Sequence, residues 1–90
     1  MNYQFRATEQ FWRSFYGLSS PQKDSVRKSW ELFKADPFHP SLGVHKINNL
    51  SARYKKTIYS AVIESDLRVV FFIEGNVVIS VDVGTHDLYR

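Results

Sequence analysis

The 90-residue sequence contains no cysteine, only three prolines and four glycines, and no apolar run of membrane-spanning length. The absence of cysteine excludes disulfides, thiolate zinc sites and cysteine nucleophiles. A membrane helix needs roughly 18 apolar residues in a row, and residues 1–6 lack the apolar stretch of a signal peptide. We therefore expect one cytoplasmic domain over residues 1–90, with no membrane contact.

Large apolar side chains are plentiful, because hydrophobic residues make up 43% of the chain and aromatic residues 16%. Aromatic rings bury much area per residue, so a chain of this length can form a core without cross-links. The net charge is +3, and residues 45–60 carry Lys46, Arg53, Lys55 and Lys56 but no acidic residue. This distribution favours a nucleic-acid or acidic-protein partner.

Two helices are expected near the N-terminus, after a short strand at residues 2–7. Aromatic residues at positions 11, 12, 15 and 16 recur at helical spacing and predict a first helix. Thr8 is suited to cap this helix, and Gly17 is expected to end it. The Ser-Pro pair at 20–21 predicts the start of a second helix, and the Asp-Pro pair at 36–37 predicts its end.

The C-terminal half is rich in β-branched and aromatic residues and predicts three strands, at residues 57–64, 67–74 and 77–85. The short loops between them indicate antiparallel hairpins. Residues 38–53 are interpreted as a surface connection with at most a short strand at 44–47. The predicted fold class is α+β, with two N-terminal helices packed on an antiparallel β-sheet in the order β-α-α-β-β-β.

The alternation of side chains predicts which residues share a face of the sheet. We expect a three-residue loop at 75–77, because a two-residue loop would place Asp82 among apolar neighbours. The face buried under the helices is then expected to contain Val69, Phe71, Ile79 and Val81. With a two-residue turn at 65–66, the opposite, mixed face is expected to contain Tyr59, Ala61, Ile63, Arg68 and His86.

Arg68 and His86 are thus expected near the same end of neighbouring strands. A guanidinium can hold a phosphate through two hydrogen bonds, and an imidazole can exchange a proton near neutral pH. Together they suit phosphodiester cleavage by a ribose hydroxyl. The alternative is a surface arginine and a strand-end histidine without a catalytic role.

The run at residues 53–56 (Arg-Tyr-Lys-Lys) predicts contacts with a nucleic-acid backbone, with Tyr54 stacking on a base. A solvated entry into a strand is the alternative interpretation. His39 and His45 flank a proline-containing turn, but no third ligand lies at a suitable spacing. We therefore expect neither a metal site nor a cofactor.

The sequence resembles the RelE/ParE toxin superfamily in the order strand, helix, helix, strands and in an ordered set of short stretches. These stretches are residues 11–15 (Phe-Trp-Arg-Ser-Phe), 36–42, 45–47, 66–71 (Asp-Leu-Arg-Val-Val-Phe) and 83–90 (Val-Gly-Thr-His-Asp-Leu-Tyr-Arg). They extend over nearly the whole chain, and the Asp-Leu-Arg and Gly-Thr-His stretches are most similar to the YafQ and YoeB branches.

The resemblance implies a toxin that an antitoxin protein holds inactive. In many members it implies an endoribonuclease that cuts mRNA on the ribosome, without metal, by attack of a ribose 2′-hydroxyl. On this resemblance Arg68 matches the strand arginine that contacts the scissile phosphate. His86 matches the histidine general acid or base. Tyr89 matches a C-terminal aromatic residue and is the third residue that we expect to be catalytic.

Three further residues take accessory places in the resemblance. His45 is similar to a histidine that precedes the central strand in the YafQ branch, and Asp66 opens the Asp-Leu-Arg stretch. Tyr59 stands where the RelE branch has a strand lysine. Two alternatives remain within the superfamily: a ParE-like, non-enzymatic inhibitor of DNA gyrase, and an orphan toxin without catalytic activity.

Overall fold

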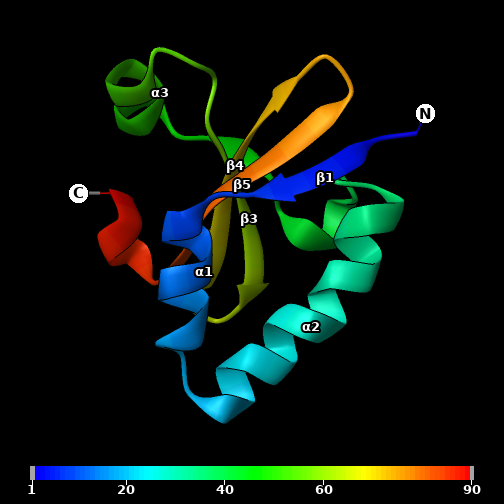
Figure 1. Cartoon of the computed structure of the whole chain (residues 1–90), viewed down its shortest axis with the longest axis vertical. Helices are drawn as coiled ribbons and strands as arrows, with labels where there is room; N and C mark the ends of the chain where they lie inside the picture. Colours follow the sequence, from blue (N-terminus) through cyan, green and yellow to red (C-terminus); the bar gives the residue numbers. More distant parts are fainter. Residues whose placement is uncertain (1, 90) are drawn as a thin grey trace.

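A computed structural model describes residues 2–89, and for His86 and Tyr89 it describes the backbone alone. Five strands form one sheet in the order β1-β5-β4-β3-β2 (Figure 1). The strands and helices are β1 (Gln4–Ala7), α1 (Glu9–Tyr16), α2 (Ser20–Ala35), the 3-10 turn η1 (Pro40–Leu42), β2 (His45–Lys46), α3 (Asn48–Tyr54), β3 (Tyr59–Glu64), β4 (Leu67–Glu74), β5 (Val77–Gly84) and the 3-10 turn η2 (His86–Tyr89). The predicted α+β class is confirmed, although β1 joins β5 in parallel rather than antiparallel.

The first two helices begin at side chains that cap them. The Thr8 hydroxyl accepts a hydrogen bond from the Phe11 amide, as the sequence predicts, and Gly17 ends α1. The cap of α2 is Ser19 and not the predicted Ser20, because Ser19 and Gln22 form a reciprocal capping box. Each cap fixes the residue at which its helix begins.

The expected surface connection at 38–53 is wrong for its second half, which forms α3. This helix has no side-chain cap and is only seven residues long, so its local signal is weak. Tertiary contacts hold it in place: Ile47 and Leu50 are buried in a cluster that includes Val70. The Ser51 hydroxyl also donates to the Ile47 carbonyl and accepts from the Ile58 amide.

Both hairpins have two-residue loops, and each contains a bulge that the alternation of side chains does not predict. Glu74 pairs with Val77, so the predicted three-residue loop at 75–77 is wrong. An extra residue, Val81, then shifts β5 against β4, and an extra residue, Ile63, shifts β3 against β4. Each bulge inverts the faces of every residue beyond it.

The bulges change the predicted membership of both faces. We call the face covered by α1 and α2 the helix face, and the opposite one the α3 face. Three residues predicted for the mixed face pack instead in the clusters of the helix face: Tyr59, Ala61 and Ile63. Val69 and Phe71 are on the helix face as predicted, but Val81 packs beside α3 and the predicted placement of Ile79 is wrong as well.

The core therefore has two layers, one on each face of the sheet. Phe11, Phe15 and Val26 pack on Val69 and Val83 on the helix face, and Phe33 packs edge-on against the fully buried Phe71. In Figure 1, α2 lies at the bottom of the molecule and α3 at the upper left. Within residues 2–89, no helix has both the length and the apolar character that crossing a bilayer requires.

Candidate functional site

Arg68 lies in β4 between the two bulges. Its neighbours in the sheet are Val62 of β3 and Gly84 of β5, and its side chain belongs to the α3 face. The residue is half-buried. Its Nε atom is buried and has no hydrogen-bond partner among the residues that the structure describes. A buried donor without a partner costs free energy, so this guanidinium is suited to receive an anionic ligand.

The turn η2 follows β5 directly and covers the sheet beside Arg68. Leu88 packs with the cluster of the α3 face, and a Cβ atom at Gly84 would come within 3.2 Å of Leu88 Cδ2. Because Gly84 is the strand partner of Arg68, its bare backbone leaves the space in which η2 settles. The backbone of His86 begins this turn. The predicted roles of the His86 and Tyr89 side chains lie outside the described residues.

The predicted RNA-binding residues do not form a strand entry. Arg53 and Tyr54 are in the last turn of α3, and Lys55 ends that helix with a positive φ of 56°. Lys56 follows, and its ammonium group pairs with Glu74 at 2.6 Å and lies over the ring of Phe72. All four side chains are exposed, so the end of α3 presents cations beside the α3 face.

Lys46 is separated from this group. It pairs with Tyr59 across β2 and β3, and directly opposed residues of a ladder point to the same face. Tyr59 is on the helix face, where it stacks on Phe71 and meets Phe38 edge-on. Lys46 and Tyr59 therefore point away from the face that carries Arg68.

The two other accessory residues are nearer to the α3 face. His45 is opposite Ser60, which pairs with Val70 of the α3 face. The Nδ1 atom of the His45 ring lies 3.1 Å from the Gly43 carbonyl oxygen. Asp66 is exposed in the turn that precedes β4. Within the described part of the chain, no three His, Asp or Glu side chains converge as metal ligands.

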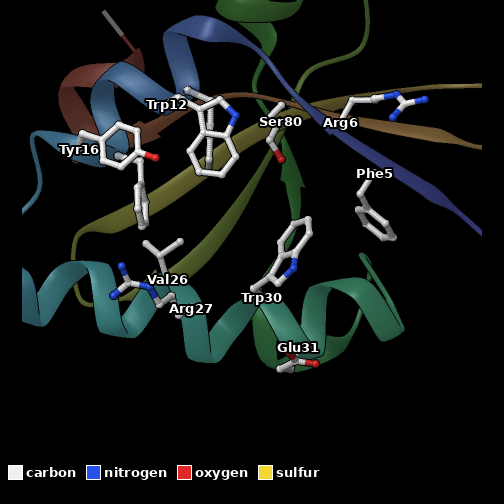
Figure 2. A pocket seen from close by; sticks show the side chains of 12 residues that line it. Phe5, Arg6, Trp12, Tyr16, Val26, Arg27, Trp30, Glu31 and Ser80 are labelled. Atoms are coloured by element: carbon white, nitrogen blue, oxygen red, sulfur yellow. The ribbon is translucent and has the colours of Figure 1, made fainter.

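A cleft of about 640 Å³ opens on the helix face, between α1 and α2. Figure 2 shows Trp12 from α1 and Trp30 from α2 pointing into it, with Arg6 and Arg27 at its rim. Trp12 is 46% exposed and Tyr16 is 68% exposed, an unusual position for rings of this size. This cleft was not predicted from the sequence.

No family model matches the sequence, and no curated protein is similar to it in sequence. Solved structures do match the whole fold. The RelE–RelB complex of Pyrococcus horikoshii gives a TM-score of 0.71 at 14% identity, covering 94% of this chain and 96% of that one. The DinJ–YafQ toxin–antitoxin complex of E. coli gives 0.74 at 11% identity, covering 98% and 97%. The chain has the RelE/ParE toxin fold.

The YoeB dimer of Staphylococcus aureus shares this RelE/ParE fold with the chain, with a TM-score of 0.67 at 19% identity over 96% of this chain and 99% of that one. The resemblance noted in the sequence is thus confirmed at the level of the fold. The cleft could have been found from one signal: Trp12 and Tyr16 lie four residues apart and so form an aromatic stripe beside the one that is buried.

Proposed function

We propose that the protein is a toxin that cleaves mRNA on the ribosome, with its site on the α3 face. The observation that carries this proposal is Arg68, whose buried Nε has no partner among the described residues. The strand partner of Arg68 is Gly84, and the turn that begins with His86 starts two residues later. Metal-independent RNA cleavage needs at least a hydrogen-bond donor that holds the phosphate and a titratable group near it.

In the proposed reaction, a ribose 2′-hydroxyl attacks the adjacent phosphorus and the bond to the 5′-oxygen breaks. The products are a 2′,3′-cyclic phosphate and a 5′-hydroxyl, so the reaction consumes no water. Arg68 holds the phosphate oxygens that gain charge, because its planar fork fits two of them. His86 exchanges the proton that the 2′-hydroxyl loses and the leaving 5′-oxygen gains, and Tyr89 contacts the RNA.

The cations at the end of α3 are proposed to hold the RNA backbone. Arg53 and Lys55 are exposed on the side of the sheet that carries Arg68, and Tyr54, 44% exposed, offers a ring for stacking. Lys46 and Tyr59 are not part of this site, because the register turns them to the helix face.

We also propose that an antitoxin protein occupies the cleft between α1 and α2. Two of the matching structures are complexes, one of RelE with RelB and one of YafQ with DinJ. Trp12 and Tyr16 present exposed rings, and Arg6 and Arg27 stand at the rim. Arg27 is already paired with Asp24 at 3.1 Å. The cleft therefore fits an amphipathic segment that carries apolar residues and a carboxylate for Arg6.

The test is cleavage of a defined mRNA in a purified translation extract, with the ends mapped. Arg68→Ala and His86→Ala should each reduce cleavage by roughly 10²–10⁴-fold. Arg68→Lys should recover little, since a lysine lacks the planar fork. EDTA should leave cleavage intact when it is added to ribosome complexes that have already been assembled and crosslinked.

A DNA supercoiling assay with gyrase is run beside it. Intact mRNA together with blocked supercoiling would replace the proposed function with gyrase inhibition. Intact mRNA and normal supercoiling would indicate an orphan toxin. Cleavage that His86→Ala leaves unchanged would remove His86 from the mechanism.

A further inference from the structure

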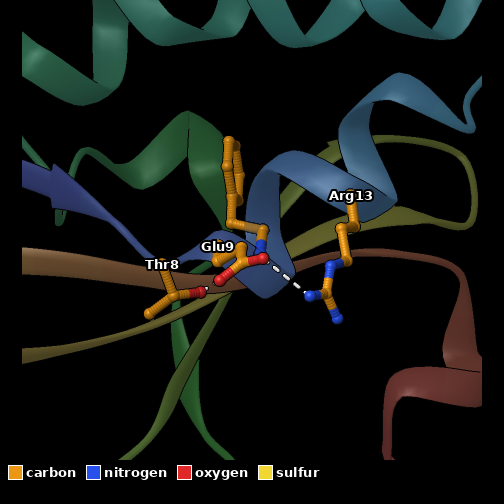
Figure 3. Close-up of polar contacts among 4 residues, drawn as sticks. Thr8, Glu9 and Arg13 are labelled. Carbon is orange, nitrogen blue, oxygen red and sulfur yellow. Dashed lines mark hydrogen bonds and ion pairs between the residues drawn. The ribbon is translucent and has the colours of Figure 1, made fainter.

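Thr8 lies where β1 ends and α1 begins (Figure 3), and its hydrogen bonds reach both α1 and β5. Its amide donates to the Ser80 carbonyl at 3.0 Å. Its hydroxyl donates to the Val81 carbonyl at 2.8 Å and accepts from the Phe11 amide at 3.1 Å. The side chain that caps α1 is therefore also bonded to β5.

The β5 residue that Thr8 holds is the bulge itself. Val81 is the extra residue between Ser80, opposite Phe71, and Asp82, opposite Val70. The pairing of β1 with β5 ends at Ala7 and Ser80, so no strand amide of β1 reaches the Val81 carbonyl. The Thr8 hydroxyl supplies a donor to this carbonyl, and buried backbone carbonyls are stabilised by such partners.

The bulge decides what stands next to Arg68. Without it, Val81 would oppose Val70 and Val83 would oppose Arg68, while Asp82 would turn toward the buried helix face. With it, Gly84 is opposite Arg68 and leaves space for Leu88 and the turn η2. Bulges next to functional sites commonly re-aim side chains in this way.

We infer that Thr8 is a positioning residue of the RNA site: its hydroxyl holds the β5 bulge that places Gly84 and η2 against Arg68. The inference rests on the proposed function for its activity readout, but not for its structural one. Thr8 itself is bonded to β5 on the side that faces β1 and does not touch the substrate. Its two roles, capping α1 and holding the bulge, can be separated chemically.

Three substitutions and one control make this separation. Thr8→Ser keeps both hydrogen bonds, Thr8→Asp accepts from Phe11 but has no proton for the Val81 carbonyl, and Thr8→Val loses both. The matched control is Ser19→Ala, which removes the cap of α2 far from β5. The readouts are the amide NMR positions of residues 82–88, the thermal midpoint, and kcat against KM for mRNA cleavage.

We expect Thr8→Asp and Thr8→Val to shift the amides of residues 82–88 and to lower kcat by about 10²-fold, the usual effect of a misplacement of about 1 Å. Thr8→Ser should keep the wild-type amide positions and the wild-type kcat, and Ser19→Ala should lower only the thermal midpoint. Shifted amides without any wild-type cleavage would remove the proposed function and retain the positioning role. Unshifted amides in Thr8→Asp would overturn the inference. So would failure of both Thr8→Asp and Thr8→Val to fold, since Thr8 would then serve stability alone.

Discussion

The Lys56 ammonium group lies 2.6 Å from a carboxylate oxygen of Glu74 and 5.0 Å from the centre of the Phe72 ring. This pair joins the segment after α3 to the end of β4. Both side chains are largely exposed, 43% and 58%, so the pair itself contributes little to stability. Its effect is on the charge available to a ligand, because Glu74 already neutralises Lys56 while Lys55 has no ion pair with a described residue.

Replacement of Lys55 should therefore weaken RNA binding more than replacement of Lys56. Each phosphate contact to a single strand contributes about 0.7 to the slope of log affinity against log salt. Lys55→Gln should lower that slope by about 0.7, and Lys56→Gln by clearly less. Ribosome co-sedimentation over a salt series measures both. Equal slopes for the two variants would show that Glu74 does not shield Lys56 in the complex.

Lys55 also allows its charge to be removed without loss of stability. It ends α3 with φ 56°, a conformation that costs most residues about 1 kcal/mol and glycine almost nothing. Lys55→Gly should leave the free energy of unfolding unchanged or raise it by up to about 1 kcal/mol, while RNA binding weakens as in Lys55→Gln. Chemical denaturation of the two variants tests this. A lower midpoint for Lys55→Gly than for Lys55→Gln would contradict it.

Gly84 should tolerate the methyl group of alanine but not the isopropyl group of valine. In Gly84→Ala the new Cβ would lie 3.2 Å from Leu88 Cδ2 and 3.4 Å from Leu88 Cγ, a contact that a small rotation of the Leu88 side chain relieves. Gly84→Val has no such escape, and overpacking typically costs about 1–3 kcal/mol. We expect near-normal cleavage for the first variant and a large loss for the second. Combining Gly84→Val with Leu88→Ala should restore part of the cleavage, and no recovery would argue against the packing explanation.

The exposed rings of the cleft should matter for partner binding and not for stability. The antitoxin is identified as the protein that restores growth to cells expressing the toxin. Trp12→Ala should weaken its binding by about 2 kcal/mol or more, the size of an interface hot spot. Phe38→Ala is the matched control, because Phe38 is 42% exposed but lies outside the cleft. Calorimetric titration distinguishes the two. Equal affinities would remove Trp12 from the interface.

The elements with strong local signals were predictable, and those made by tertiary contacts were not. Thr8, Gly17 and the strand-rich C-terminal half identify α1 and the β3–β5 meander from short-range chemistry alone. The helix α3 and the bulge in β5 depend on partners far along the chain: Val70 for α3, and Thr8 for the bulge at Val81. Side-chain alternation assumes an unbroken ladder, so it placed Tyr59 on the wrong face.

The pairing of β1 with β5 has a consequence for synthesis of the chain. Gln4 finds its strand partner at Val77, and Thr8 finds its own acceptor 73 residues later at Val81. Long-range pairing of this kind is slow and waits for both segments to be available. While the chain grows at about 5–20 residues per second, its first strand has no partner until β5 has left the exit tunnel. A nascent copy therefore cannot assemble the α3 face before β5 has left the exit tunnel.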